Sequence, residues 1–583
     1  MRAAKQVTAW LQLTRLFLRQ FLENDLVSPD SDRAQLLAVV GAGVVSLTLF
    51  ISMFLSAPYS MSRLTPGQAA VLTLNDKFFY VSLAMLVTAL IAAAQWDALA
   101  LDHRDSAILD PLPIRPAIVR AAKLTAVAIL GAVAAIAVNV FPTFVFPWML
   151  SFSVRQMSAV DVFRLMAIHA MVTVTSAVFG YLAVMAFRET LSALLGPKLF
   201  TRWSPSLQAS TIVVLGSLLL LLPPASTRTA QRGFTGWWAQ LPSMSFVALY
   251  EVASREFIID LPRTRMSPRM AARDPEPTAL YAQRRPLFAP MAQRVELLLG
   301  GTVATLVIAT VISGLRAPIG GALLLAGGRR RSRVFHRIAN TLIVRHPAAR
   351  AGFHFAFATL FRSKTHRLTL ACAAAAALSM MLFVLSRTDL QVAKLTPGLL
   401  SLQPLLYGSL LVAFRHLVRI PAELRANWGV QLAWRDHVRR FNDGVALAGL
   451  ASLAVPAILI VVPLVSWVSS PSMALVHAAV GVLGAMIVVE ALMLGWEKPA
   501  FVCSYVPGAA KALVPMLVMA FFIGANAFAR VELGILNGNN VIRNVVLLIA
   551  IYGGLRVASI RRRDPQIDFN EGPETFSQLS LHN

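Results

Sequence analysis

The chain has 583 residues, of which 57% are hydrophobic and only 14% are charged. This composition excludes an ordinary soluble domain, in which about a quarter of the residues are charged. The net charge of +25 does not indicate a nucleic-acid partner, because the basic residues lie in short loops between apolar runs, as membrane topology requires.

The chain opens with a stretch that is predicted to be an amphipathic helix within a cytoplasmic segment, residues 1–35. Apolar residues recur between residues 7 and 22 at the i, i+3, i+4 spacing of one helix face. Lys5, Arg15 and Arg19 lie beside this face. Such a helix is expected to lie at the inner surface of a membrane.

Twelve apolar runs follow, each about as long as a helix that crosses a ~30 Å hydrocarbon layer. Helices and closed barrels alone satisfy their backbone there, and these runs are too long for barrel strands. The predicted spans are 36–57, 78–96, 124–150, 165–187, 209–225 and 297–315, then 368–386, 395–414, 445–468, 472–494, 512–529 and 541–558.

The spans predict an all-α polytopic membrane protein of two halves, 36–315 and 368–558, joined by a basic linker, 316–367. A second amphipathic stretch, 353–367, precedes the second half. In each half a long cytoplasmic loop, 97–123 or 415–444, separates the second span from the third. This layout predicts two parallel six-helix repeats, each preceded by an interfacial helix.

The positions of lysine and arginine predict the orientation. The linker 316–367 contains many basic residues and no acidic residue, which places it in the cytoplasm. Three arginines at 561–563 place the tail, 559–583, on the same side, so both termini are expected to be cytoplasmic. The loop 226–296 then lies outside. It is predicted to hold a short surface helix at 244–258, with Glu251 and Glu256 exposed, and an irregular tract at 263–286.

Few polar groups interrupt the spans. Glu490 is a functional candidate because a carboxylate within a span is costly. The alternative is that its side chain extends to the nearby interface between membrane and water. His169 and His477 are expected to be hydrogen-bonded core residues, and Asn139 is expected to form an internal hydrogen bond in its helix. No ladder of charged residues follows the spans, which speaks against a proton-coupled or sodium-coupled transporter.

The loop 97–123 has the sharpest local pattern. Acidic residues follow the second span, a proline-rich turn comes next, and a lysine opens the third span. Prolines between short helices predict a compact elbow at the inner surface. This elbow suits docking to a cytoplasmic partner, or it is a plain interfacial turn. The residues concerned are Asp102, Asp105, Leu112, Pro113, Ile114, Arg115 and Lys123.

These residues resemble the coupling-helix region of the transmembrane subunits of type 2 ABC exporters. In that family an acidic residue, a Leu-Pro-Ile/Val-basic turn and a lysine surround a short helix that contacts the ATPase. The whole layout resembles large bacterial permease-like proteins in which two such halves are fused. The loop of the second half lacks the Leu-Pro-Ile turn, and its candidates for coupling are Pro421, Glu423 and Trp428.

The resemblance implies a permease, an exporter, in the bacterial cytoplasmic (inner) membrane, among membrane lipids. A separate ATP-binding subunit, in two copies, would drive it. The chain has no Gly-x-x-x-x-Gly-Lys-Ser/Thr motif, and its two cysteines match no metal spacing. We therefore expect neither enzymatic activity nor a cofactor. A secondary transporter with six plus six helices and a membrane-embedded glycan or lipid enzyme are the alternatives.

Overall fold

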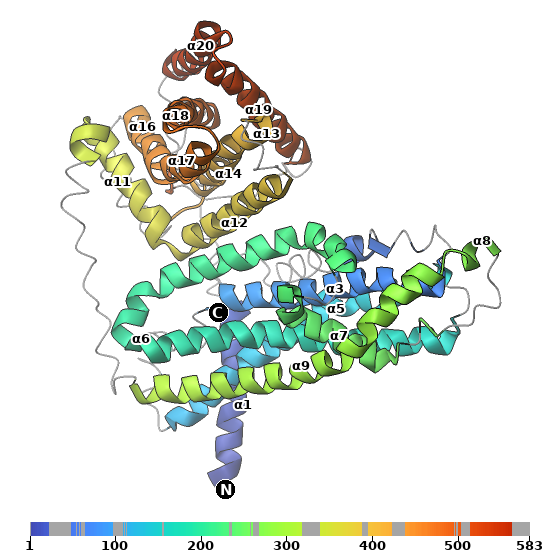
Figure 1. Ribbon diagram of the computed structural model, residues 1–583. Coiled ribbons are helices and arrows are strands. Elements are labelled where there is room, and N and C mark those ends of the chain that lie inside the picture. The colour runs from blue at the N-terminus through green and yellow to red at the C-terminus, as the bar shows by residue number, and fades with distance from the viewer. Residues whose placement is uncertain are drawn as a thin grey trace, which may run out of the picture. The chain divides into compact units, whose positions relative to one another are not determined.

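The computed structural model describes most of the chain, and Figure 1 shows its ribbon. The described residues are 2–22, 48–53, 55–56, 59, 64–96, 109, 111, 114–153, 157–232, 236–256, 258–260, 268–316, 339–387, 395–422, 438–494, 496, 500–502 and 514–561. Their regular secondary structure is helical, and no strand occurs among them. The predicted all-α class is confirmed for this part of the chain.

The helices are labelled in chain order, and η marks short 3-10 or π turns. The first group is α1 (Arg2–Leu22), α3 (Pro66–Ala94), α5 (Pro116–Ser153), α6 (Ala159–Arg232), η1 (Gly236–Gln240), α7 (Pro242–Ser254), α8 (Pro268–Ala271) and α9 (Pro275–Arg316). The second group is η2 (Ala339–Ile343), α11 (Pro347–Arg362), α12 (Lys364–Arg387), α13 (Pro397–Leu400), α14 (Leu402–Leu417), α16 (Val438–Gly449), η4 (Leu450–Ala454), α17 (Val455–Val468), α18 (Pro471–Met493), α19 (Val514–Leu536) and α20 (Val541–Arg561).

Nine helices within the described residues are long and apolar enough to cross a membrane, as expected of a multi-pass membrane protein. They overlap every predicted span except two. Most of the span 36–57 lies outside the described residues, and the span 512–529 corresponds to α19, which is not one of the nine. The total of twelve spans and the repeat layout stay predictions.

Local sequence sets many of the helix starts. Eight of the helices begin at a proline, whose fixed φ suits the first helical position. At α3, the Thr65 hydroxyl accepts a hydrogen bond from the Gln68 backbone, and the Gln68 side chain accepts one from the Thr65 backbone. Ser470 likewise accepts a bond from the Met473 backbone at the start of α18. These caps satisfy donors that would otherwise be orphaned.

The long helix α6 contains a break at Gly196, where φ is 70° and ψ is 167°. Glycine adopts this conformation at no steric cost because it lacks a Cβ. The break separates the two predicted spans 165–187 and 209–225, which α6 joins into one helical run. A connecting loop between them is therefore reduced to a single non-helical residue.

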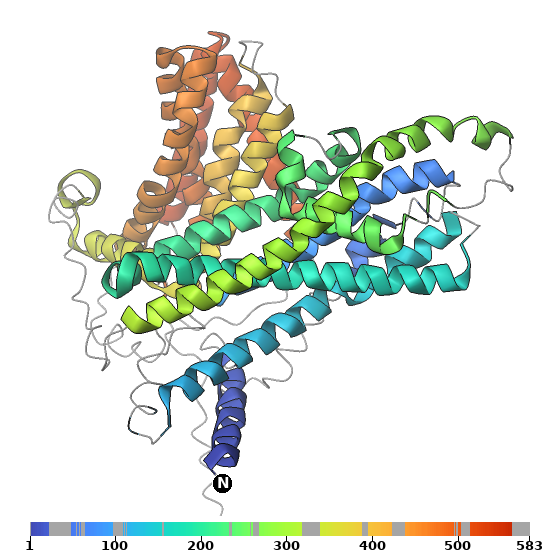
Figure 2. The same cartoon turned by 60° about the horizontal axis from the view of Figure 1, so that its bottom comes forward.

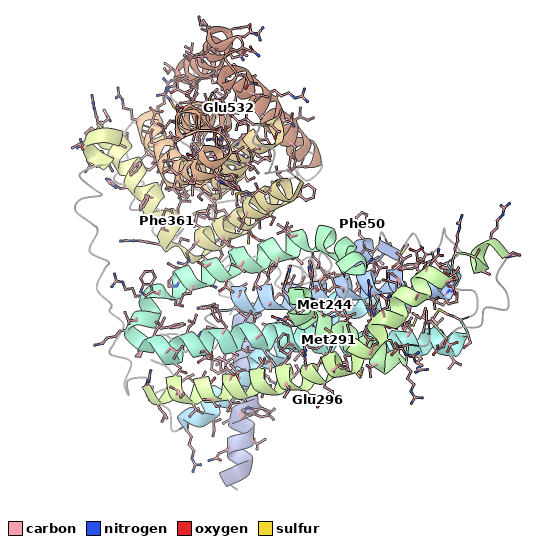
Figure 3. All side chains as sticks on the ribbon, viewed as in Figure 1. Phe50, Met244, Met291, Glu296, Phe361 and Glu532 are labelled. Atoms are coloured by element: carbon pink, nitrogen blue, oxygen red, sulfur yellow. The ribbon has the colours of Figure 1, made fainter. Side chains whose placement is uncertain are left out.

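Contacts divide the chain into two units. Residues 1–211 and 218–326 form the first unit, and residues 212–217 and 327–583 form the second. The core of the first unit lies where α3 packs against α7 and α9. Met244 of α7 and Met291 of α9 belong to this core (Figure 3). In the second unit, α14, α17 and α18 pack around another apolar core.

The expectations for the loop 226–296 were partly wrong. A short helix is present, but α7 is mostly buried in the core of the first unit, and only 2% of Glu251 is exposed. The tract 263–286 is not irregular throughout, because α9 begins at Pro275 and continues through Pro286. Apolar side chains of its first half, such as Phe288, pack into the core. That burial compensates for the hydrogen bond lost at a proline.

Candidate functional site

In the first unit, the amphipathic helix α1 packs on the beginning of α5 (Figure 2). Phe17, on the predicted apolar face of α1, is buried against Val119 and Ala122 of α5, and so is Leu13, which lies outside the predicted face. The helix itself is confirmed. Its apolar face is partly used for packing on another helix, and its location at a membrane surface stays a prediction.

The described part of the predicted coupling region lies at this contact. Ile114 packs against the α1–α5 cluster, whereas Arg115 is exposed. Lys123 is buried, and its ammonium group lies 5.2 Å from the centroid of the Phe17 ring. A cation at this distance is attracted to the face of the ring. The other predicted residues lie outside the described part: Asp102, Asp105, Leu112 and Pro113.

In the second unit, α11 packs on α16 at backbone distance. A Cβ atom on Gly352 would lie 2.9 Å from the carbonyl carbon of Phe441. A Cβ atom on Gly444 would lie 2.7 Å from the carbonyl carbon of Ala349. Both distances are shorter than a normal carbon–carbon contact of about 3.5–4.0 Å. The contact therefore requires glycine on both helices.

The turn that enters the predicted second coupling loop is fixed by two backbone hydrogen bonds. The Phe501 amide donates to the Val418 carbonyl at 2.9 Å, and the Ala422 amide donates to the Phe501 carbonyl at 2.8 Å. Pro421, half-buried, lies in this turn. The remaining predicted residues of the loop, Glu423 and Trp428, lie outside the described residues.

Glu490 on α18 has ionic neighbours that the sequence did not reveal. Its Oε1 accepts a hydrogen bond from Nη1 of Arg556 on α20 at 3.0 Å. The same guanidinium group bonds both carboxylate oxygens of Asp443 on α16, at 2.9 and 3.3 Å. The three side chains connect α16, α18 and α20. Glu490 therefore has a structural role in this contact, and its functional role within a span stays a prediction.

A second ionic cluster, in the first unit, was not predicted. Nζ of Lys77 on α3 lies 2.5 Å from Oε1 of Glu251 on α7, and both side chains are almost fully buried. The Tyr281 hydroxyl of α9 donates to the other Glu251 oxygen at 2.6 Å. Burying two charges is costly unless they are paired and hydrogen-bonded. The cluster therefore ties α7 to α3 and α9.

The cluster continues through Tyr250 to His169. Burial, and then the charge of the adjacent Glu251, raises the pKa of Tyr250 well above its ordinary value. Its hydroxyl therefore remains protonated, and it lies 3.3 Å from Nδ1 of His169 on α6. The rings of Tyr80 and Phe146 pack on this imidazole. His169 is thus a hydrogen-bonded core residue, as predicted.

A lysine next to an apolar run was the signal that could have revealed this cluster. The predicted span begins at Phe78, one residue after Lys77, so this lysine lies just outside the predicted apolar run. In the structure α3 begins at Pro66, which places Lys77 well inside the helix. A charged residue there requires a partner, but its identity, Glu251, depends on the fold.

Small residues in two spans take part in helix packing. A Cβ atom added to Gly131 would lie against the Tyr181 ring, and a Cβ atom added to Gly449 would lie against the Phe414 ring. Each contact lies within one unit. Within the described residues, no group of three or more His, Cys, Asp or Glu side chains has the arrangement of a metal site.

Comparisons with known protein families, with characterised proteins and with solved structures find no match to this chain. Its function therefore has to be inferred from the residues and contacts described above.

Proposed function

We propose that this chain is the membrane permease of an ABC exporter, driven by a separate ATPase subunit bound in two copies. The observation that carries the proposal is the position of the amphipathic helices. In the first unit, the helix before the first predicted span packs on the beginning of the third predicted span, α1 on α5. In the second unit, α11 packs on α16 in the same way. This agreement supports two parallel repeats.

The loop before each third span would receive the ATPase, as in the exporters that the sequence resembles. Closure of the ATPase dimer would displace these loops, and the packed helices would transmit the displacement. The close contact of α11 with α16, where Gly352 faces the Phe441 backbone and Gly444 faces the Ala349 backbone, suits this role because helices packed this closely would shift together. The Lys123–Phe17 contact would couple α1 to α5.

The same proposal places both termini, the linker 316–367 and the exposed Arg115 in the cytoplasm of a bacterial cell. The loop that contains α7 and α8 then lies outside or at the outer end of the spans. The Arg and Lys distribution supports this orientation.

Co-purification in mild detergent from the native membrane tests the proposal. Mass spectrometry should find a stoichiometric ATPase with a Gly-x-x-x-x-Gly-Lys-Ser/Thr motif. Arg115→Glu should reduce the bound ATPase by roughly tenfold, equivalent to ~1.4 kcal/mol of binding free energy. Arg269→Glu is the matched control, because Arg269 is also exposed but lies on α8, in the loop proposed to be outside.

Two results would overturn the proposal. One is the absence of any such ATPase under conditions that preserve a known ABC complex. The other is equal binding of the ATPase by the Arg115→Glu and Arg269→Glu proteins.

A further inference from the structure

Two ionisable side chains meet inside the second unit. Nδ1 of His477 on α18 lies 2.5 Å from Oε1 of Glu532 on α19. Neither side chain has any exposed surface. Figure 3 shows Glu532 among the helices of this unit. The helix that carries His477 is one of the nine apolar helices of membrane-spanning length.

The pair is neutral when it holds one proton between the two atoms. The proton is on nitrogen in an imidazolium–carboxylate pair and on oxygen in an imidazole–carboxylic acid pair. Both forms have zero net charge and the same number of protons. Removing this proton leaves a carboxylate next to a neutral imidazole, and adding a second leaves an imidazolium next to a carboxylic acid. Either change places an unpaired charge in an apolar interior, which is costly. The closed pair therefore retains one proton.

Gln403 of α14 adds a third buried polar side chain next to this pair. Its Nε2 donates to the backbone carbonyl of His477 at 3.2 Å. Gly481, one turn after His477, leaves room for the Gln403 amide, because a Cβ at that position would overlap it. Three buried atoms have no hydrogen-bond partner within the described part of the chain: Gln403 Oε1, His477 Nε2 and Glu532 Oε2.

Other charged groups on the helices around the pair are engaged elsewhere or lie at the surface. Tyr407 of α14 is a buried titratable group close to Glu532. On α16, α18 and α20, Asp443, Glu490 and Arg556 bond one another. Arg530 of α19 and Arg543 of α20 are exposed and bond Asn526 and Asn544. In the described residues, α13, η4 and α17 contain no charged side chain.

We propose that His477, Glu532 and Gln403 form a proton-binding site in the second unit. The site holds one proton while α18 and α19 are in contact and releases it to water when they separate. A hydrated imidazole has a pKa of about 6.5 and a hydrated carboxyl group a pKa of about 4.3. Above about pH 7 an opened pair is therefore imidazole plus carboxylate, and its shared proton has become hydronium. Mild acid favours the closed contact.

Unfolding of the full-length protein in mixed micelles of detergent and denaturing detergent tests this site. The folded protein, with the pair closed, holds one more proton than the unfolded protein. The unfolding equilibrium constant of the wild type should therefore rise about tenfold per pH unit between about pH 7 and pH 9. This rise is measured relative to a variant without the pair. The variant is His477→Gln with Glu532→Gln, whose amides can still hydrogen-bond each other. The matched control is Glu490→Gln with Arg556→Gln, which removes another ionic pair of the same unit and should keep the wild-type slope.

Parallel pH profiles of the wild type and the His477→Gln, Glu532→Gln protein would overturn the proposal. The single variant Glu532→Gln provides a second test if the double variant does not fold, because an amide holds no titratable proton and must abolish the same slope. The measurement requires no ATPase, so its result is independent of the proposed exporter function.

Discussion

Replacing Gly352 or Gly444 with alanine is expected to force α11 and α16 apart. A new Cβ would lie 2.9 Å from the carbonyl carbon of Phe441 in the first case. In the second it would lie 2.7 Å from that of Ala349. A normal carbon–carbon contact is about 3.5–4.0 Å, so the helices must separate by roughly 1 Å. The obstacle is backbone, which cannot rotate away as a side chain can.

The expected loss of stability follows from two opposing effects. Overpacking a well-packed contact costs about 1–3 kcal/mol. Alanine in place of glycine within a helix returns about 0.5–1 kcal/mol. Each variant should therefore lose roughly 1–2 kcal/mol of unfolding free energy. Both glycines lie at one contact, so a helix displaced by the first alanine already accommodates the second, and the double variant should lose less than the sum.

Unfolding in mixed micelles with increasing denaturing detergent measures these differences. Gly554→Ala on α20 is the matched control, because no atom lies within 4 Å of its added Cβ and it should not destabilise the protein. The reasoning would be refuted if Gly352→Ala behaved like Gly554→Ala. It would also be refuted if the losses of the two alanine variants simply added.

Three further predictions concern charged groups. Lys77→Met should cost roughly 3–5 kcal/mol because it leaves the buried Glu251 carboxylate without its cation, and adding Glu251→Gln should restore most of that loss in the same unfolding assay. Arg556→Gln should cost less than about 1 kcal/mol, and less still in high salt, because this guanidinium is about one third exposed; a loss equal to that of Lys77→Met would contradict this. Burial raises the pKa of Glu256, so its ionisation destabilises the fold as pH rises through that pKa. Glu256→Gln should match the wild type in acid and exceed its thermal midpoint at neutral pH, and identical midpoints at every pH would argue against this.

Part of the packing around the proposed coupling region could be predicted from the sequence. The apolar face of α1 was predicted from local spacing, and Phe17 lies on it. By contrast, α5 begins at Pro116 rather than at residue 124, so Lys123 lies inside the helix rather than before it. The contact of Phe17 with Lys123 across more than one hundred residues could not be predicted from spacing. The burial of Glu251 was missed for the same reason, since an acidic residue in a loop gives no local sign of a lysine on a distant helix.

The sequence by itself determined most of the long apolar helices, because the length of an apolar run, a proline at a first position and a capping hydroxyl act within a few residues of one another. It also determined the approximate ends of most spans. The tertiary structure decided which helices touch and which charges are paired: Lys77 with Glu251, Glu490 with Arg556, and His477 with Glu532. The physical reason is that a buried charge must have a partner, whereas the choice of partner depends on helix packing that no local pattern encodes.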